Sequence, residues 1–328
     1  MNLSCVWKLA VCAPAAFVVA NAGAQQSATD AYPARPVMMV LPFAPGGSPD
    51  FAARKLAEKL TQSMGRQFLV DFKPGGGTGI ATGFVARSAP DGYTLLYVTN
   101  SFTVLPAVTS KNLPYDPNRD FEALVLLSKQ PSFLLVNPAL PIRNLKEYIA
   151  YARAKPEAIN FGMVGTGGGN HLSAAWLHNL MGIKVTFVPY KGSTLLPLVG
   201  GELQASAATV SAALSFVKSG KLRAIANTDS VRSPALPDVP TVAEQGVAGF
   251  EFAPWQGWLA PAGIAPAIAH KLELEFIAAL KSPDLLETME KTGTVPIGGS
   301  GAQFKKLLSA ELVRWKKVAQ DYNITTDE

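Results

Sequence analysis

An apolar run, a loop rich in proline and glycine, and a helical pattern follow one another without a break near the start of this chain. Val37–Leu41 is apolar throughout and predicts a buried strand. The loop after it reads Pro42-Phe43-Ala44-Pro45-Gly46-Gly47-Ser48-Pro49-Asp50, and its last three residues suit the N-cap, first position and first turn of a helix. Residues 53–64 then repeat apolar side chains at helical spacing. The succession predicts a strand, a tight elbow and a helix N-terminus.

Such an elbow is suited to binding an anion. Free backbone N–H groups and the positive end of the helix dipole both point into the crevice at the carboxyl end of the strand. The alternative is an ordinary tight turn between a strand and a helix, and the loop alone does not decide between the two. Asp50 stabilises the helix dipole as a first-turn acid in either case.

A second glycine-rich loop occurs later in the chain. Gly165-Thr166-Gly167-Gly168-Gly169-Asn170-His171 follows a predicted strand at Ile159–Val164 and opens a helical pattern, with Asn170 as the expected N-cap. It is not a dinucleotide fingerprint, because the third glycine of that pattern would fall on Asn170. The sequence therefore predicts a second anion-binding elbow here, with a flexible loop as the alternative.

The N-terminus has the composition of an export signal. Met1–Lys8 is weakly positive, Leu9–Ala20 is apolar and Ala22-Gly23-Ala24 is a cleavage site with small residues. The apolar core is too short for a membrane anchor. We expect residues 1–24 to be a cleaved signal peptide, so that the mature chain begins at Gln25 in the periplasm.

Both cysteines belong to this segment. Cleavage after Ala24 removes Cys5 and Cys12, which leaves no disulfide, thiolate nucleophile or cysteine metal ligand. Lipidation of Cys12 is the alternative, but the bulky Val11 precedes it inside the apolar core. An exported chain without disulfides has to depend on large hydrophobic cores.

The charge pattern argues against nucleic acid as a partner. The formal net charge is +5, and the basic residues are scattered, with no run longer than a pair. Solvated helix faces explain this pattern better than a nucleic-acid surface. A mild positive balance still suits a small anionic ligand.

Short apolar strands alternate with amphipathic helices along the chain, which predicts an α/β fold with parallel, doubly wound sheets. We expect two lobes and a hinge between them. Residues 33–130 and 254–328 form a discontinuous domain 1 in this prediction, and residues 131–253 form domain 2. The tail after Pro261 reads as purely helical and is expected to pack on domain 1. The expected strands and helices lie at residues 67–71, 93–98, 133–136, 145–154, 159–164, 171–181, 185–188, 211–219, 222–226 and 303–322.

No motif assembles a catalytic or metal centre. The nucleophile elbow Gly-x-Ser-x-Gly and the phosphate loop with Gly-Lys-Ser/Thr are both absent from the sequence. His171 and His178 are too far apart along a helix to share a metal, and His171 is expected to bond a neighbouring loop. We therefore expect no enzyme activity, no cofactor and no metal. Tyr190, in a turn after a predicted strand, is either a core residue or a ligand contact.

Ordered sequence blocks give the chain a resemblance to a known family. They extend over the whole mature chain, and so many blocks in one order make the match specific. The chain resembles the Bug-type solute-binding receptors of tripartite tricarboxylate transporters, which are exported proteins of Gram-negative bacteria. Besides the two glycine-rich loops, the blocks are Tyr32-Pro33-x-Arg35-Pro36, Pro90-Asp91-Gly92-Tyr93, Leu113-Pro114-Tyr115-Asp116-Pro117, Pro189-Tyr190-Lys191-Gly192, Gly220-Lys221-Leu222-Arg223, Leu236-Pro237-Asp238-Val239-Pro240 and Ala260-Pro261-Ala262-Gly263.

The resemblance implies a two-lobed periplasmic binding protein of type II-like fold, in which each lobe is a sheet flanked by helices. It also implies hinge closure on a small organic carboxylate, delivery to transient membrane transporter subunits and a monomeric state. The ligand is expected in the interdomain cleft, held by backbone amides and bridging waters. The expected ligand-binding residues are Phe43, Ala44, Gly46, Gly47, Ser48, Asp50, Ser101, Phe102, Thr166, Gly167, Gly168, Gly169, His171, Tyr190 and Thr209.

Three departures from the family pattern bear on the ligand. Gly168 stands where the family usually has Ser or Thr, and the stretch between Gly192 and Gly200 is shorter than usual. The segment Ala205–Val210 lacks the acidic residue commonly found there. Without that acid a second carboxylate is not repelled, so we expect a dicarboxylate or an aromatic acid in preference to an amino acid. Ser206 and Thr209 are candidate hydrogen-bonding groups, and Phe43, Phe102, Tyr190 and Trp255 are candidate apolar walls or core residues.

Two other functions are compatible with the sequence. A receptor of this type could serve as a ligand sensor for a membrane signalling partner, and gene neighbourhood would discriminate this case. A secreted hydrolase or lyase on the same fold would need a clustered acid–base pair. The sequence offers only Asp50 and His171, on opposite lobes of the predicted fold.

Overall fold

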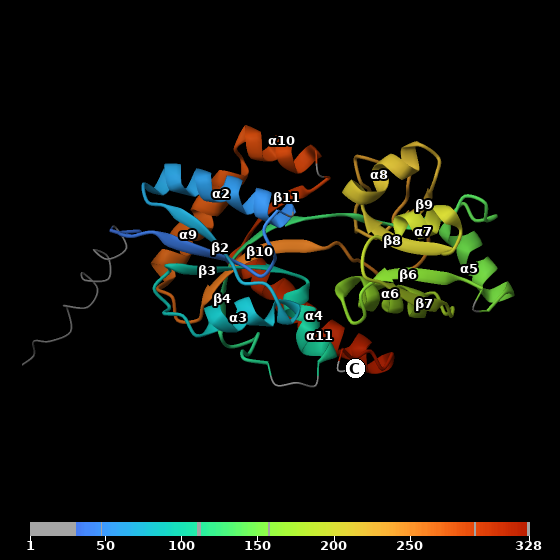
Figure 1. Ribbon diagram of the computed structural model, residues 1–328, viewed down its shortest axis with the longest axis horizontal. Helices are drawn as coiled ribbons and strands as arrows, with labels where there is room; N and C mark the ends of the chain where they lie inside the picture. The colour runs from blue at the N-terminus through green and yellow to red at the C-terminus, as the bar shows by residue number, and fades with distance from the viewer. Residues whose placement is uncertain (1–30, 47, 110–112, 157, 292, 327–328) are drawn as a thin grey trace, which may run out of the picture.

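The computed structural model describes residues 31–46, 48–109, 113–156, 158–291 and 293–326. The predicted signal peptide at residues 1–24, Gln25 and Gly47 lie outside these ranges. The described residues form two mixed sheets, each flanked by helices, that make two lobes side by side (Figure 1). We call the lobe of the six-stranded sheet lobe 1 and that of the five-stranded sheet lobe 2.

The sheet of lobe 1 has the strand order β11-β4-β10-β3-β1-β2. Strand β1 pairs in parallel with β2 and β3, whereas β10 is antiparallel to both β3 and β4, and β11 is antiparallel to β4. Its strands are β1 (Val37–Leu41), β2 (Phe68–Phe72), β3 (Thr94–Thr99), β4 (Phe121–Lys129), β10 (Trp255–Pro261) and β11 (Val295–Ser300).

Helices cover both faces of this sheet. On one face α2 packs against α9 and α10 over a core that contains Trp258 and Phe276. The core of the other face joins α3, α4 and α11 to the sheet through Phe102 and Phe304. The helices of lobe 1 are α2 (Ser48–Met64), the short 3₁₀ helix η1 (Gly76–Thr78), α3 (Gly79–Ala86), α4 (Ser101–Val108), α9 (Pro266–Leu280), α10 (Pro283–Lys291) and α11 (Gly301–Asp321).

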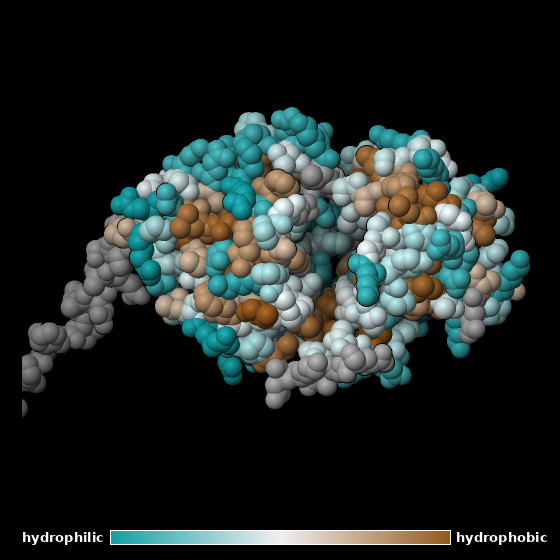
Figure 2. All heavy atoms as spheres, viewed as in Figure 1, coloured by the Kyte–Doolittle hydropathy of each residue, from teal (hydrophilic) through white to brown (hydrophobic). Residues whose placement is uncertain are grey.

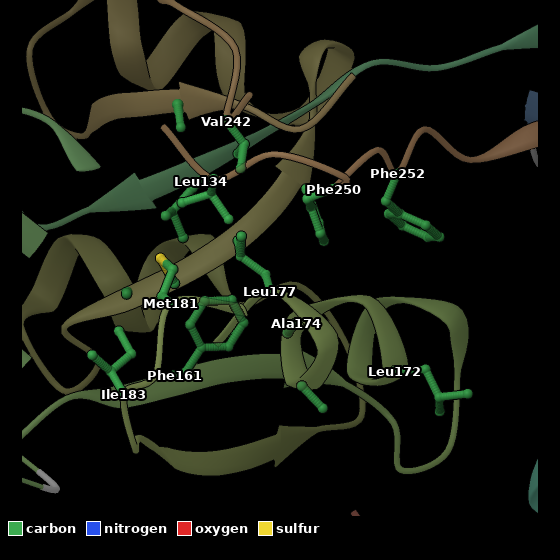
Figure 3. Packing of buried hydrophobic residues seen from close by; sticks show 14 of the residues in the cluster. Leu134, Phe161, Leu172, Ala174, Leu177, Met181, Ile183, Val242, Phe250 and Phe252 are labelled. Atoms are coloured by element: carbon green, nitrogen blue, oxygen red, sulfur yellow. The ribbon is translucent and has the colours of Figure 1, made fainter. Parts of the chain in front are cut away.

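Lobe 2 has the strand order β7-β6-β8-β5-β9. Figure 3 shows its interior, where Leu134 of the sheet and Leu177 of α6 lie near Phe161; all three are buried. Its strands are β5 (Ser132–Val136), β6 (Asn160–Val164), β7 (Thr186–Tyr190), β8 (Ala205–Thr209) and β9 (Arg223–Asn227). Its helices are α5 (Leu145–Ala154), α6 (Gly169–Leu180), α7 (Leu195–Gly200) and α8 (Val210–Lys218).

The chain passes between the lobes twice, and the two passages are bonded to each other. The Gln130 N–H donates to the carbonyl of Pro254 (2.7 Å). The hydroxyl of Thr228 lies 3.0 Å from the carbonyl of Ser132 and 2.7 Å from that of Phe252. Paired passages of this kind let one lobe move against the other as a unit.

A shared hydrophobic core also joins the lobes. Trp315 of α11 is fully buried and meets Trp176 of α6 edge to face, with ring centroids 6.0 Å apart. It also contacts Phe252 in the second passage, at 5.8 Å. Helix α11 therefore packs on lobe 2 as well as on lobe 1, where alone it was expected.

Two expectations about the fold were wrong. The tail after Pro261 is not purely helical, because β11 returns to the sheet of lobe 1 and pairs with β4. Both sheets are mixed and not purely parallel, since β10 is antiparallel to β3 and β4 in lobe 1 and β5 is antiparallel to β8 and β9 in lobe 2. In lobe 1 the strands β4, β10 and β11 were not predicted from the apolar runs, whereas in lobe 2 all strands except β8 were predicted and the direction of β5 was not. No described helix is long and apolar enough to cross a membrane.

Candidate ligand-binding site

In lobe 1 the elbow before α2 is bonded to a carboxylate of the protein itself, that of Asp50. Gly46 has a positive φ of 92° and donates its N–H to Oδ2 of Asp50 at 2.8 Å. The other oxygen of Asp50 accepts from Nε of Arg54 at 2.6 Å, one turn further along α2. Asp50 is only 6% exposed. Its carboxylate thus satisfies a backbone amide of the elbow and compensates the positive end of the helix dipole.

The elbow of lobe 2 closes in the same way with a neutral group. Gly167 has a positive φ of 72° and donates its N–H to Nδ1 of His171 at 3.2 Å. The Gly165 N–H donates to the carbonyl of Tyr190 (3.0 Å), which ties the loop to the end of β7. Burial lowers the pKa of His171, so the ring is neutral at pH 7 with its proton on Nε2. As expected, His171 bonds a neighbouring loop.

The N-terminus of α6 therefore lacks a negative group of its own. The first turn of α6 contains no acidic residue, in contrast to the first turn of α2, which contains Asp50. The predicted cap Asn170 was wrong, because α6 begins at Gly169 and Gly168 occupies the cap position without a side-chain bond. A helix N-terminus without an acidic group of its own is typical of anion-binding sites.

The surface is hollowed between the two lobes (Figure 2), and the elbow before α2 lies on the side of lobe 1 that faces lobe 2 (Figure 1). The elbow of lobe 2 lies against the start of α4. A Cβ added to Gly169 would be 3.6 Å from Cβ of Asn100, which directly precedes Ser101. On the other side of the junction, a Cβ on Gly293 would be 2.9 Å from the side chain of Val210. The start of α4 and the start of α8 thus both lie at the junction of the lobes.

Several of the expected site residues lie near these helix starts and are at least partly exposed. Ser101 is partly exposed and its N–H faces Oγ1 of Thr99 at 3.4 Å. Thr209 is partly exposed and its hydroxyl lies 3.1 Å from that of Ser211. Tyr190 is partly buried beside the elbow of lobe 2. Of the remaining elbow residues, Ala44, Gly46 and Thr166 are exposed, Gly168 and Gly169 are half-buried, and Gly167 is buried.

Two expected residues fall where the structure does not describe them. Gly47 lies outside the described residues. Ser48 is the first residue of α2, and its side chain is not among those described.

The aromatic candidates divide between the elbow and the core. Phe43 is partly exposed and meets Tyr97 edge to face at 6.1 Å. Phe102 is 1% exposed and stacks on Tyr115 inside lobe 1, so it lines the core in this conformation and not the cleft. Trp255 is likewise buried, against Phe304.

Ser206 is a further correction. It is fully buried, and its hydroxyl bonds the carbonyl of Gly162 and the hydroxyl of Thr194. It therefore does not face the cleft. The other histidine of α6, His178, bonds Tyr148 and the carbonyl of Ala174 within lobe 2, and burial lowers its pKa to about 4.

Sequence reasoning missed two features of the site. Arg54 fixes the carboxylate of Asp50, and the signal was present as an acid and a base four residues apart on one helix. Lys129, at the end of β4, pairs at 2.7 Å with the buried Asp229 of lobe 2. No signal in the sequence could have found this pair, because the two residues are a hundred positions apart. The described residues contain no cluster of three or more His, Cys, Asp or Glu side chains that could hold a metal.

Comparison with known proteins places this geometry in a family. Residues 52–324 match the family described as "Tripartite tricarboxylate transporter family receptor". Protein BugT of Bordetella pertussis is 34% identical over 307 residues, which cover 92% of this chain and 94% of BugT.

Two solved structures are similar over almost their whole length. An R. palustris protein solved with adipate is 32% identical, with a TM-score of 0.73, and the match covers 90% of this chain and 99% of that one. MatC from Rhodopseudomonas palustris, solved with bound malate, is 30% identical, with a TM-score of 0.70 and coverage of 88% and 99%. The two-lobed α/β fold and the resemblance to Bug-type receptors are confirmed. The chain belongs to the receptor family of the tripartite tricarboxylate transporters, a family of solute-binding proteins.

Proposed function

We propose that this protein is a periplasmic receptor that captures a small organic carboxylate between its lobes by hinge closure. It then delivers the ligand to the membrane subunits of a tripartite tricarboxylate transporter, and it does so as a monomer without a cofactor. Export follows from the signal peptide expected at residues 1–24. Relatives solved with adipate and malate support a carboxylate ligand.

One observation carries this proposal: two glycine elbows at helix N-termini, one in each lobe, are both held by a side chain four residues further on. This bond fixes the loop before a ligand arrives, so backbone N–H groups are oriented at no further entropic cost. A helix N-terminus neutralises a carboxylate without a cationic side chain. The α6 elbow, which has no acid, provides the stronger half of the site.

The proposed hinge follows the two passages of the chain. In this proposal residues 33–130 and 254–328 move as one body and residues 131–253 as the other, which is the division predicted from the sequence. The bond from Gln130 to Pro254 lies at this boundary. Since α11 packs on α6, closure pivots about this shared core and narrows the opposite side of the cleft.

The proposed ligand is a dicarboxylate or an aromatic acid. The end of β8 provides the partly exposed Thr209 and no acidic residue between Ala205 and Val210. An acid there would repel a second carboxylate and attract an amine, whereas this uncharged segment does neither. The ligand contacts we propose are the elbow residues of both lobes together with Ser101, Tyr190 and Thr209.

Isothermal calorimetry against a panel of acids tests the proposal. The panel contains zwitterionic amino acids, aliphatic di- and tricarboxylates, and benzoate- or phthalate-type acids. We expect binding of at least one acid from the last two groups with a Kd on the order of 1 μM, about 8 kcal/mol. Tight binding of an amino acid alone, with no heat from the other acids, would refute the ligand class.

A further inference from the structure

A cavity of about 450 Å³ lies in lobe 1 beside the elbow of α2. Phe51 and Ala52 of α2 form one wall, and Leu285 and Met289 of α10 form the opposite wall. Most of the surface area that faces the cavity is apolar, although polar and charged side chains also line it. A cavity of this size and character is typical of small-molecule sites, which measure roughly 300–1,000 Å³ and carry a few polar groups.

The polar part of the lining comprises two side-chain amides, Gln130 after β4 and Gln256 of β10, two threonines, Thr288 and Thr294, and three charged residues of α2, Arg54, Lys55 and Glu58. Gln130 donates from Nε2 to the hydroxyl of Thr294 at 3.1 Å, and Gln256 accepts from the hydroxyl of Ser128 at 3.2 Å. Each amide is thus held in place by a neighbour. The two amides are uncharged, and the charged groups of the lining, Arg54, Lys55 and Glu58, all lie on the α2 side of the cavity.

The cavity adjoins the proposed carboxylate site on two sides. Arg54 lines it and also holds Asp50, whose other oxygen closes the elbow at Gly46. Thr294, on its far side, follows Gly293, which lies against Val210 of lobe 2. The cavity therefore lies between the α2 elbow and the junction of the lobes.

Phe51 indicates what the cavity accepts. Its side chain belongs to the first turns of α2, yet the residue is 62% exposed. When a ligand covers an exposed aromatic ring at the rim of an apolar cavity, the ring is removed from water, and this burial stabilises the complex.

We propose that this cavity is a subsite for the hydrophobic part of the ligand, which makes the preferred substrate a dicarboxylate that bears an aryl or branched aliphatic group. The carboxylates bind at the elbows and the apolar group enters the space between α2 and α10. This inference rests on the proposed function, because the elbows supply the anchor.

Calorimetry with succinate and phenylsuccinate tests the subsite, since the two acids share both carboxylates and differ by one phenyl group. We expect phenylsuccinate to bind the wild-type protein at least tenfold more tightly, because its ring is removed from water. Ala52→Trp fills the cavity from α2 and should abolish this preference while changing the Kd for succinate less than twofold. Ala310→Trp, at an exposed position of α11, is the matched control and should leave both affinities unchanged.

Phe51→Ala provides a second variant, whose folding does not require the protein to accommodate a larger side chain as Ala52→Trp does. Phe51 is mostly exposed, so this variant should fold, and we expect it to weaken phenylsuccinate binding about threefold and succinate binding not at all. Equal affinity of the wild type for the two acids, or an unchanged preference in Ala52→Trp, would overturn the subsite and leave the proposed function intact. Absence of binding by either acid, together with failure of the whole acid panel, would overturn both.

Discussion

The two elbows of this protein use the same local structure with opposite electrostatics. In each, a glycine with positive φ donates its N–H to a side chain four residues further on. In lobe 1 the acceptor is the carboxylate of Asp50, paired with Arg54, and in lobe 2 it is the neutral ring of His171. The comparison shows that loop geometry and charge are set independently. A ligand carboxylate is therefore expected to gain more from the lobe 2 elbow, where the helix N-terminus has no negative group of its own.

The elbows also differ in how tightly they are packed. A Cβ on Gly46 would have no atom within 4 Å, whereas a Cβ on Gly167 would overlap the side chain of Thr326 and approach Val108 of α4. The backbone N–H of Thr326 is itself bonded to the carbonyl of Val108. The elbow of lobe 2 is thus part of the contact between the lobes, and that of lobe 1 is not.

Alanine at these two glycines should have unequal effects, and this is the largest difference we expect. Both variants strain a positive φ, at about 1 kcal/mol. Gly167→Ala must also displace Thr326, so we expect the free energy of unfolding to fall by about 3 kcal/mol in total. Urea denaturation of the two variants measures the difference. Gly192→Ala is a control, because Gly192 has open space around it and no positive φ. Equal losses for Gly46→Ala and Gly167→Ala would contradict the packing difference.

A carboxylate introduced into the second elbow should weaken ligand binding. His171→Asp places an anion at the N-terminus of α6, where we propose that the ligand carboxylate binds. We expect the Kd for the tightest dicarboxylate of the panel to rise about tenfold at pH 8, since two like charges then compete for one dipole. His171→Asn, which is uncharged, should raise it less than threefold. Calorimetry on both variants checks this, and equal Kd values for Asp and Asn would show that charge at this position is unimportant.

Removal of the negative charge in the elbow of lobe 1 should strengthen ligand binding, by a smaller factor than the added charge in lobe 2 weakens it. Asp50→Asn keeps an oxygen that can accept from Gly46 and removes the negative charge next to the site. We expect the affinity for a dicarboxylate to rise about threefold at low ionic strength, and most of this gain to persist in 0.5 M salt, because Asp50 is buried and salt screens buried charges less. An affinity that falls with Asp50→Asn would mean that Asp50 contacts the ligand favourably.

Acidification should affect the second elbow through His171. Burial lowers the folded-state pKa of His171 below the value of about 6.5 in the unfolded chain. The unfolded state then binds more protons below pH 6.5, so the stability that neutral His171 contributes is complete above that pH and is lost as the pH falls. His178 acts in the same direction, with a folded pKa of about 4.

We expect the free energy of unfolding to decline from about pH 6.5 to about pH 4. His171→Gln should make this decline slightly shallower, and His178→Gln should reduce it more. Urea denaturation at half-unit pH intervals measures both slopes. A decline that is identical in wild type and in both variants would exclude the two histidines as its source.

The sequence predicted those parts of the fold whose signals are local. The strand, elbow and helix at residues 37–64 and the helix Leu145–Ala154 lie where the apolar spacing placed them, although α2 begins at Ser48, one residue before the predicted first position. A bond from His171 to a neighbouring loop was also expected, and its partner is Gly167 in the loop before α6. Such features depend on residues within one or two turns of each other, so a window of sequence contains their cause.

The remainder depends on distant contacts. Strand β11 contains Pro296 and two glycines, a composition that predicts a turn, and it is a strand because β4 offers a pairing edge. Phe102 and Ser206 read equally well as site or core residues, and only the packing of α4 on Tyr115 and the bond of Ser206 to Gly162 place them inside. The pair of Lys129 and Asp229 likewise exists only once the lobes meet.

Small-angle X-ray scattering of the wild-type protein, with and without the tightest acid found by calorimetry, tests the central claim most directly. Two opposed elbows complete a site only when the lobes close, so saturating ligand should reduce the radius of gyration. His171→Asp at the same ligand concentration should remain closer to the free form, because it binds more weakly. An unchanged radius of gyration in the wild type, with calorimetry showing full saturation, would contradict capture by hinge closure.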